Sequence, residues 1–271
     1  MRNEHISHLR IPKIGLGTSR IGGRVIPNRS RESYWLKILH SALDVGYNHI
    51  DTAEFYALGY SEELIGRAIA ASHIAREAVF ITTKVWPIHL GYKNLIKSCE
   101  RSLRRLATDF IDLYLIHIPN PFIPLEDTFR ALNQLVIQGK VRNIGVSNFN
   151  LELLRQSLEL CITPLITNQI PYSIFNRTYA QNGVIECCKE NDILITAYSP
   201  LRDRRIEINP ILRSIAREHS ATPQQIALAW LTTQTHVITI PMSFNPIHLR
   251  ENIESLEIKL SQEEMDQLTN L

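Results

Sequence analysis

Four polar side chains in three short segments could together deliver a proton to a carbonyl group. They are Asp51 and Tyr56 in GYNHIDTAEFY, Lys84 in VFITTKVW and His117 in DLYLIHIPNP. Each lies at or just past the end of an apolar run that is typical of a buried strand. The ends of parallel barrel strands meet at one face, so residues far apart in sequence can meet there. A phenol, an ammonium, a carboxylate and an imidazole in one pocket predict a proton-donating site.

The elements that must position these residues alternate regularly along the chain. Short continuous apolar runs, as in buried parallel strands, are each followed by sequence with helical periodicity. The predicted strands are 12–17, 47–50, 78–83, 110–116, 141–146, 165–168, 193–197 and 237–240. The predicted helices are 32–45, 61–71, 93–106, 125–138, 151–158, 179–190, 210–219, 223–232, 247–256 and 262–268.

Eight strands that are each followed by helical sequence predict an α/β fold, a (β/α)8 TIM barrel. We expect residues 1–271 to form one such domain, because no linker or low-complexity stretch interrupts the pattern. The alternative is an open doubly wound sheet with a G-x-G-x-x-G phosphate loop. The segment Gly15-Leu16-Gly17-Thr18-Ser19-Arg20 lacks the third glycine, so we discount this alternative.

Composition excludes several classes of protein. The formal charge is +2 and apolar residues make up 44%, which favours a large core and argues against a nucleic-acid or membrane-surface partner. No apolar run is long enough to span a membrane, and the start lacks the apolar core of a signal peptide. We therefore expect a soluble cytoplasmic protein, with His5 and His8 in a mobile N-terminal segment.

The cysteines and histidines do not predict a metal site. None of the cysteines has C-x-x-C spacing, and no cluster of histidine and cysteine has the spacing of metal ligands. The adjacent Cys187 and Cys188 lie in a helical stretch. Helix packing is favoured for this pair over a redox or metal role.

Motifs along nearly the whole chain, from about residue 11 to 265, resemble the aldo-keto reductase family. The matching segments are IGLGT, NHIDTAEFY, ITTKVW, LIHIPNP, GKVRNIGVSNF, TNQIPYS, ITAYSPL, TPQQIALAWL and the IP dipeptide at 240–241. The resemblance implies a (β/α)8 barrel that binds a nicotinamide cofactor without a Rossmann domain. It also implies reduction of an aldehyde or ketone to an alcohol with NAD(P)H.

In this family the positions of Asp51, Tyr56, Lys84 and His117 form the catalytic tetrad. Tyr56 would protonate the substrate oxygen, although a free phenol, with a pKa of about 10, is a weak acid at neutral pH. Lys84 would lower that pKa as a nearby ammonium, and Asp51 would hold Lys84 in place and charged. His117 would orient and polarise the substrate carbonyl.

The resemblance also implies a cofactor site. Ser147, Asn148 and Gln169 would hydrogen-bond the nicotinamide carboxamide, and Tyr198 would stack on the ring. The other implied cofactor residues are Thr18 near the ribose, Ser199 and Leu201 after the seventh strand, and Ser243, His248, Glu251 and Asn252 toward the phosphate and adenine.

The phosphate site departs from the common family pattern. Many members have a lysine and an arginine, which contact the 2′-phosphate of NADPH, where this chain has Met242 and His248. We therefore expect NADPH as the cofactor, with NADH also possible. Arg202, Arg204 and Arg205 could supply the missing positive charge, or they could simply form a solvated loop.

The substrate pocket departs as well. Ser19 and Ile118 occupy positions where many members have tryptophan, whereas Trp86 is retained. These three are the candidate substrate residues, with Tyr92, Pro121 and Phe122 as weaker ones. A pocket with fewer aromatic side chains should be roomier yet mostly apolar. The natural carbonyl substrate stays open.

The alternative function is a nucleotide-binding regulatory or partner subunit on the same barrel, with little turnover. No coiled coil or exposed apolar stripe in the sequence favours it. We expect a monomer that takes a small-molecule carbonyl substrate.

Overall fold

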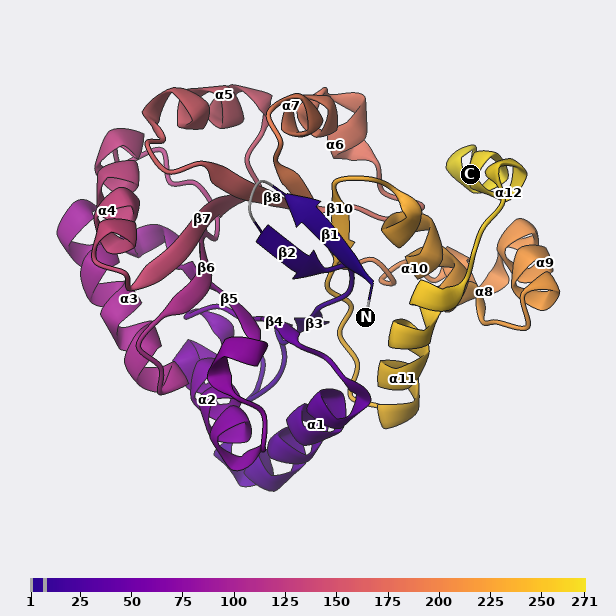
Figure 1. The fold of residues 1–271 in the computed structure, drawn as a ribbon, viewed down its shortest axis with the longest axis horizontal. Helices are drawn as coiled ribbons and strands as arrows, with labels where there is room; N and C mark the ends of the chain where they lie inside the picture. Colours follow the sequence, from indigo (N-terminus) through magenta and orange to yellow (C-terminus); the bar gives the residue numbers. More distant parts are fainter. Residues whose placement is uncertain (1, 7–8) are drawn as a thin grey trace.

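The computed structural model describes residues 2–6 and 9–271 and forms a ring of parallel strands surrounded by helices (Figure 1). The eight-stranded sheet follows chain order within these described residues. Its strands are β3 (Leu16–Gly17), β4 (His49–Asp51), β5 (Phe80–Val85), β6 (Ile111–Ile116), β7 (Val141–Ser147), β8 (Leu165–Pro171), β9 (Leu194–Tyr198) and β10 (Val237–Thr239).

The ring closes between its first and last strands. Ile14, just before β3, forms a parallel bridge with Thr239, and the Gly15 amide donates to the Thr239 carbonyl over 2.8 Å. The prediction of a closed (β/α)8 barrel is confirmed. The first strand, predicted over 12–17, is shorter than expected, because only Leu16–Gly17 pairs as a regular strand with β4.

Helices cover the outside of the barrel and bury their apolar faces against the strands. They are α1 (Glu32–Val45), α2 (Tyr60–Ala71), α3 (Tyr92–Leu106), α4 (Leu125–Ile137), α5 (Leu151–Leu160), α6 (Thr178–Gln181), α7 (Val184–Glu190), α8 (Arg205–Ile208), α9 (Pro210–Glu218), α10 (Pro223–Thr233), α11 (Pro246–Glu254) and α12 (Gln262–Thr269). Short 3-10 turns are η1 (Arg29–Arg31), η2 (Tyr56–Gly59), η3 (Arg76–Ala78), η4 (Pro87–His89) and η5 (Ser255–Glu257).

The single helix predicted over 179–190 is wrong in one respect. Gly183 has a φ of 77° and separates α6 from α7. A left-handed residue cannot continue a right-handed helix, and glycine takes this conformation at low cost. Cys187 and Cys188 are buried in α7, in agreement with a packing role.

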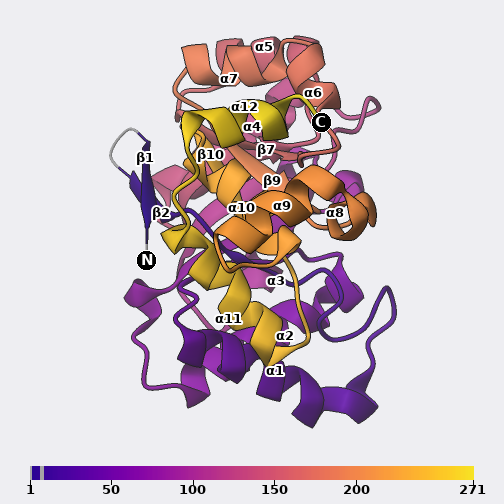
Figure 2. The same cartoon turned by 90° about the vertical axis from the view of Figure 1, so that its right-hand side faces the viewer.

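The N-terminal segment is a structured hairpin, which corrects the expectation of a mobile end. Strands β1 (Asn3–Ile6) and β2 (Leu9–Pro12) pair in antiparallel fashion, with His5 opposite Arg10. His8 lies outside the described residues. The hairpin crosses the middle of the ring in Figure 1 and lies at one edge of the barrel in Figure 2.

This hairpin closes the end of the barrel at which the strands begin. Ile6 and Ile11 are buried in a separate apolar cluster with Leu113, Leu115, Ile166, Leu194 and Ile238. The Lys13 ammonium, which follows β2, donates to the carbonyls of Gln234 over 2.7 Å and Val237 over 3.0 Å. The hairpin is thereby tied to the last turn of the barrel, and the opposite end is left for the site.

The barrel interior also holds an unusual buried histidine. The Nε2 atom of His49 lies 3.1 Å from the hydroxyl of Thr82 on the neighbouring strand. Gly15 makes room for this ring, because a Cβ there would lie 2.6 Å from His49 Nδ1. Burial, assisted by the Lys84 charge, lowers the pKa of His49 to about 3, so its imidazole is neutral at physiological pH.

Mild acid is expected to destabilise the barrel through His49. Below pH 6.5, the ordinary pKa of histidine, the imidazole of His49 takes up a proton in the unfolded chain. In the folded chain its pKa is about 3, so it stays neutral. The unfolded state then binds more protons, so stability falls as pH falls, by up to about 1.4 kcal/mol per pH unit for this residue. Urea unfolding at about pH 7, 6 and 5 measures the slope, in a range above most carboxylate titration.

His49→Gln removes this titrating group and should lower the slope by up to about 1.4 kcal/mol per pH unit, even where it lowers the absolute stability. The contribution of His117, whose pKa is likewise lowered to about 3, should remain. The exposed His73 provides a matched control, and His73→Gln should leave the profile as it is in the wild type. An unchanged slope in His49→Gln would contradict the assignment.

Candidate active site

The predicted catalytic side chains converge at the carboxyl ends of neighbouring strands. Asp51, Tyr56 and His117 line one cavity of about 590 Å³, and Lys84 contacts Asp51 from a fully buried position. Asp51 ends β4, Lys84 lies near the end of β5 and His117 directly follows β6. The structure therefore brings all four together.

Lys84 and Asp51 form a buried ion pair. The Lys84 ammonium donates to Asp51 Oδ1 over 2.5 Å and to the Thr52 carbonyl over 2.7 Å. Burial alone would lower the pKa of Lys84, but the opposing effects of Asp51 and Tyr56 together outweigh it, and the pKa lies above its ordinary value. Lys84 is therefore a fixed positive charge at neutral pH.

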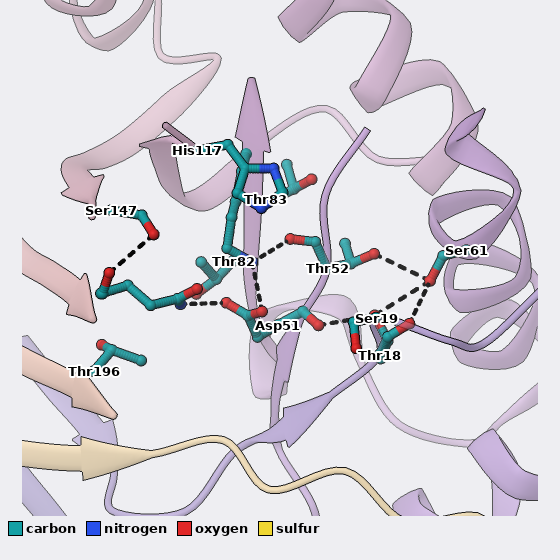
Figure 3. A network of polar contacts seen from close by, with 12 residues as sticks. Thr18, Ser19, Asp51, Thr52, Ser61, Thr82, Thr83, His117, Ser147 and Thr196 are labelled. Carbon is teal, nitrogen blue, oxygen red and sulfur yellow. Dashed lines mark hydrogen bonds and ion pairs between the residues drawn. The ribbon is translucent and has the colours of Figure 1, made fainter. Parts of the chain in front are cut away.

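Asp51 is the centre of a polar network that holds this pair in place (Figure 3). Its second oxygen, Oδ2, accepts a hydrogen bond from Gln169 Nε2 over 2.7 Å. Its backbone carbonyl accepts from the amide and the hydroxyl of Thr18, over 3.0 Å and 2.8 Å. Ser61, from α2, donates to Thr18 and accepts from Thr52, both over 3.2 Å. Both carboxylate oxygens of Asp51 thus have fixed donors.

Tyr56 is half-buried beside this pair and is protonated. Its ring centroid is 5.2 Å from the Lys84 nitrogen and 5.6 Å from the centroid of the His117 ring, which stands nearly perpendicular to it. Burial raises the pKa of Tyr56 and outweighs the opposing effect of the Lys84 ammonium. Lys84 does act to lower this pKa, as predicted from the sequence, but the prediction of a net lowering is wrong because burial has the larger effect. A phenol that stays protonated at neutral pH can act as a proton donor.

A strained turn follows Tyr56. Ala57, Leu58 and Gly59 have φ values of 47°, 52° and 88°, which are left-handed conformations. At the non-glycine residues Ala57 and Leu58 this conformation costs free energy and persists only where the surrounding structure imposes it, often at functional sites. A Cβ at Gly59 would lie 2.4 Å from Arg105 Nε, whose guanidinium pairs with the buried Glu62 of α2. The turn is therefore held by the packing of α2 against α3.

His117 is a neutral imidazole. Burial, followed by the nearby Lys84 charge, lowers the pKa of His117 to about 3. Its backbone is fixed on both sides, since its amide donates to Val85 and its carbonyl accepts from Asn148 Nδ2. It can hydrogen-bond a substrate oxygen, but it is not a cationic acid at neutral pH.

Most of the predicted cofactor residues line the same cavity. They are Thr18, Ser147, Asn148, Gln169, Tyr198, Ser199 and Leu201. Three of these form one chain, in which the Tyr198 hydroxyl donates to Asn148 Oδ1 over 2.9 Å and Asn148 Nδ2 donates to Ser147 Oγ over 3.0 Å. Asn148 and Ser199 both have left-handed backbone conformations, with φ of 62° and 54°. This side of the cavity is a preorganised polar wall with an aromatic face beside it.

Four predicted cofactor residues lie outside the described lining of this cavity: Ser243, His248, Glu251 and Asn252. Ser243 precedes α11, where its hydroxyl accepts from the Asn245 amide over 3.1 Å. His248 is exposed on α11, and Asn252 is buried. Their roles stay predictions.

Of the three predicted substrate residues, two line the cavity and one does not. Ser19 and Ile118 line the cavity. Trp86 lies outside the described lining, and its ring packs on Phe55 with 5.0 Å between centroids. The weaker candidates Tyr92, Pro121 and Phe122 are likewise outside it.

Cavity-lining arginines were partly missed from the sequence. Arg202 lines the cavity, whereas Arg205 pairs with Asp203 over 2.7 Å and Arg204 lies outside the described lining. Arg20 and Arg24, in the loop after β3, also line the cavity and were not predicted. Their proximity to Thr18 and Ser19 in the sequence was the available signal.

Residues 2–6 and 9–271 show neither a metal-binding cluster nor a membrane-spanning helix. In that part of the chain, no group of three histidine, cysteine, aspartate or glutamate side chains could hold a metal ion. Among the helices described, none combines the length and the apolar character needed to cross a membrane.

Comparison with curated proteins finds reductases that align over nearly the full length. A 9,11-endoperoxide prostaglandin H2 reductase of Trypanosoma cruzi is 37% identical, with 97% of this chain and 88% of that protein covered. A glyoxal reductase of Bacillus subtilis is 36% identical, with 97% and 90% covered.

Solved structures agree with this result. A thermostable aldo-keto reductase, Tm1743, in complex with the inhibitor epalrestat is 44% identical and superimposes with a TM-score of 0.95, covering 100% of this chain and 99% of that one. An aldo/keto reductase of Klebsiella pneumoniae in complex with NADP and acetate is 32% identical, with a TM-score of 0.88 and coverage of 96% and 91%.

A model of the Aldo/keto reductase family matches residues 13–271. The matched range includes Asp51, Tyr56, Lys84 and His117, as well as Ser147 and Asn148 of the polar wall. The chain therefore belongs to the aldo/keto reductase family.

Proposed function

We propose that this protein reduces an aldehyde or ketone to an alcohol with a nicotinamide cofactor, with Tyr56 as the proton donor. The observation that carries the proposal is the protonated phenol of Tyr56 beside the fixed Lys84 charge, in a cavity that also contains the polar wall of Ser147 and Asn148. The relatives named as glyoxal and methylglyoxal reductases support the reaction class.

The proposed chemistry needs a hydride and a proton at the two ends of the carbonyl bond. A reduced nicotinamide held by Ser147, Asn148, Gln169 and Tyr198 would supply the hydride for the carbonyl carbon. The Tyr56 hydroxyl gives its proton to the carbonyl oxygen, and the Lys84 ammonium stabilises the phenolate that remains. Neutral His117 donates a hydrogen bond to the same oxygen and orients it. Solvent then restores the proton of Tyr56.

The residues on the polar wall fit a nicotinamide. The Oε1 atom of Gln169 can accept from a carboxamide while its Nε2 is held by Asp51. Tyr198 is kept in place by its bond to Asn148, so its ring face is available for stacking. Structures of two Klebsiella pneumoniae relatives were solved with NADP and with NADPH, which supports a cofactor of this class.

The chain has cationic side chains suited to the diphosphate of the cofactor but fewer for its 2′-phosphate. Arg20, Arg24 and Arg202 line the cavity and are suited to a diphosphate, which NADH and NADPH share. Met242 and His248 offer no fixed cation for the 2′-phosphate, which only NADPH carries. We therefore propose that NADH is accepted alongside NADPH.

The alternative of a nucleotide-binding regulatory or partner subunit with little turnover is not favoured, because relatives that align over nearly the whole chain are named as reductases. Small carbonyl compounds such as glyoxal and methylglyoxal are suitable first substrates. A monomeric state and a cytoplasmic location stay predictions.

Tyr56→Phe is expected to lower the rate of carbonyl reduction by at least about 100-fold, because it removes the general acid. Cofactor affinity should stay close to that of the wild type, since the hydroxyl is needed for proton transfer. Reduction of methylglyoxal and fluorescence titration of NADPH measure the two properties. Tyr34→Phe, on α1, is the matched control and should keep full activity. Wild-type turnover by Tyr56→Phe would overturn the role.

Met242→Lys combined with His248→Arg is expected to raise the NADPH-to-NADH affinity ratio by about tenfold or more, because charge-assisted contacts to the 2′-phosphate are gained. Titration with each reduced cofactor gives the ratio. The neutral pair Met242→Gln and His248→Gln controls for side-chain size and should leave the ratio unchanged. A wild-type protein that already prefers NADPH by about 100-fold would contradict the proposed tolerance of NADH.

A further inference from the structure

Glu54 is a buried carboxylate that the proposed chemistry does not use. Only 7% of its surface is exposed, and it lies two residues before Tyr56 in the connection from β4 to η2. A buried carboxylate costs free energy unless donors satisfy it, so its partners indicate what it does.

The Glu54 side chain joins three other parts of the chain. Its Oε1 accepts from the Trp86 amide over 2.5 Å and from Nδ1 of His89, in η4, over 3.0 Å. Its Oε2 accepts from the Ser98 hydroxyl of α3, and Arg101 Nη2 lies 3.7 Å away. The connection that carries Tyr56 is thereby fastened to the segment that follows β5.

The backbone of Glu54 adds a second attachment to β5. Its amide donates to the Lys84 carbonyl over 3.2 Å. Backbone and side chain of this one residue therefore hold Lys84 and Trp86, on either side of Val85. The exit of the chain from β5 is fixed relative to Tyr56.

These contacts hold an aromatic wall, formed by the rings of Phe55 and Trp86, next to His117. The Phe55 ring lies 5.0 Å from that of Trp86 and 6.5 Å from that of His117, and the His89 ring stands at 85° to Trp86 with 6.0 Å between centroids. Phe55 and Trp86 are both half-exposed, so part of the wall is open to solvent next to the cavity. Without Glu54, the Trp86 amide and the His89 ring would lose this shared acceptor, and the segment would keep its attachments at Pro87, which accepts from Asn120, and at Leu90, which accepts from Thr128.

We propose that Glu54 is a positioning residue that sets the aromatic wall of Phe55 and Trp86 for carbonyl substrates large enough to reach it, above all aromatic aldehydes. The inference rests on the proposed reduction and assigns Glu54 no proton in it. Small dicarbonyls react beside Tyr56 without touching the wall. The residue therefore governs KM for bulky substrates rather than kcat.

The test compares benzaldehyde with methylglyoxal as substrates. Glu54→Ala should raise KM for benzaldehyde by about tenfold, because a wall displaced by a fraction of an ångström loses its contacts, while kcat stays within about threefold. KM for methylglyoxal and the dissociation constant of NADPH should change by less than about threefold.

The conservative variant Glu54→Gln separates a positioning role of this side chain from an effect of its negative charge. In Glu54→Gln the amide oxygen can still accept from the Trp86 amide, so KM for benzaldehyde should return to within about threefold of the wild type. Glu63→Gln, which alters an exposed carboxylate of α2 paired with Arg29, is the matched control and should change nothing. His89→Ala, at a half-exposed position, should fold even if Glu54→Ala does not, and it should raise KM for benzaldehyde in the same direction.

The outcomes distinguish this inference from the function on which it rests. A wild-type protein that reduces neither substrate would refute the proposed function. Wild-type reduction combined with equal loss for both substrates in Glu54→Ala or His89→Ala, or with a parallel loss of NADPH affinity, would overturn only the positioning role.

Discussion

The buried ion pair between Lys84 and Asp51 is the interaction around which this site is organised. Two charges removed from water cost much free energy, and their attraction offsets that cost only where geometry and hydrogen bonds are nearly complete. Here the ammonium has two oxygen acceptors and the carboxylate has a further donor in Gln169. The register of the sheet produces this arrangement, because Asp51 lies opposite Thr82, two residues before Lys84 on the same face of β5.

The same low-dielectric environment gives the two neighbouring side chains complementary states. It raises the pKa of Tyr56, which keeps the phenol protonated, and it lowers the pKa of His117 to about 3, which keeps the imidazole neutral. One cavity then contains an acid, a neutral hydrogen-bond donor and a fixed cation. In the proposed reduction, Lys84 would favour the phenolate, so its effect would be greatest after the proton has left Tyr56.

The sequence was sufficient to predict the barrel and to predict that the polar residues at its strand ends meet in one site. Continuous apolar strands that alternate with helical stretches have few other solutions, and polar residues at strand ends must then meet at one face. The hairpin of β1 and β2 was missed because each strand has four residues, and Ile6 and Ile11 give too short a pattern to separate from a loop. The break at Gly183 was missed because one glycine within a helical pattern does not reveal its φ.

Side-chain partners were harder to predict than positions. Glu54 lies between the predicted site residues Asp51 and Tyr56 and was not singled out, because its partners Trp86, His89 and Ser98 come from elements whose packing the sequence does not specify. Arg20 and Arg24 were missed because the phosphate residues were sought where the family resemblance places them, near α11 and after β9. The position of a loop relative to a cavity depends on tertiary packing, which local patterns do not encode.

The central claim is that this barrel turns over carbonyl compounds rather than only binding a nucleotide. Loss of the absorbance of NADPH, with methylglyoxal and benzaldehyde supplied in turn and the alcohol product quantified, tests it most directly. The account predicts that NADPH is consumed only when a carbonyl compound is present, with one alcohol formed for each cofactor oxidised. Tight binding of NADPH without its oxidation by any member of a broad panel of aldehydes, ketones and dicarbonyls would contradict it.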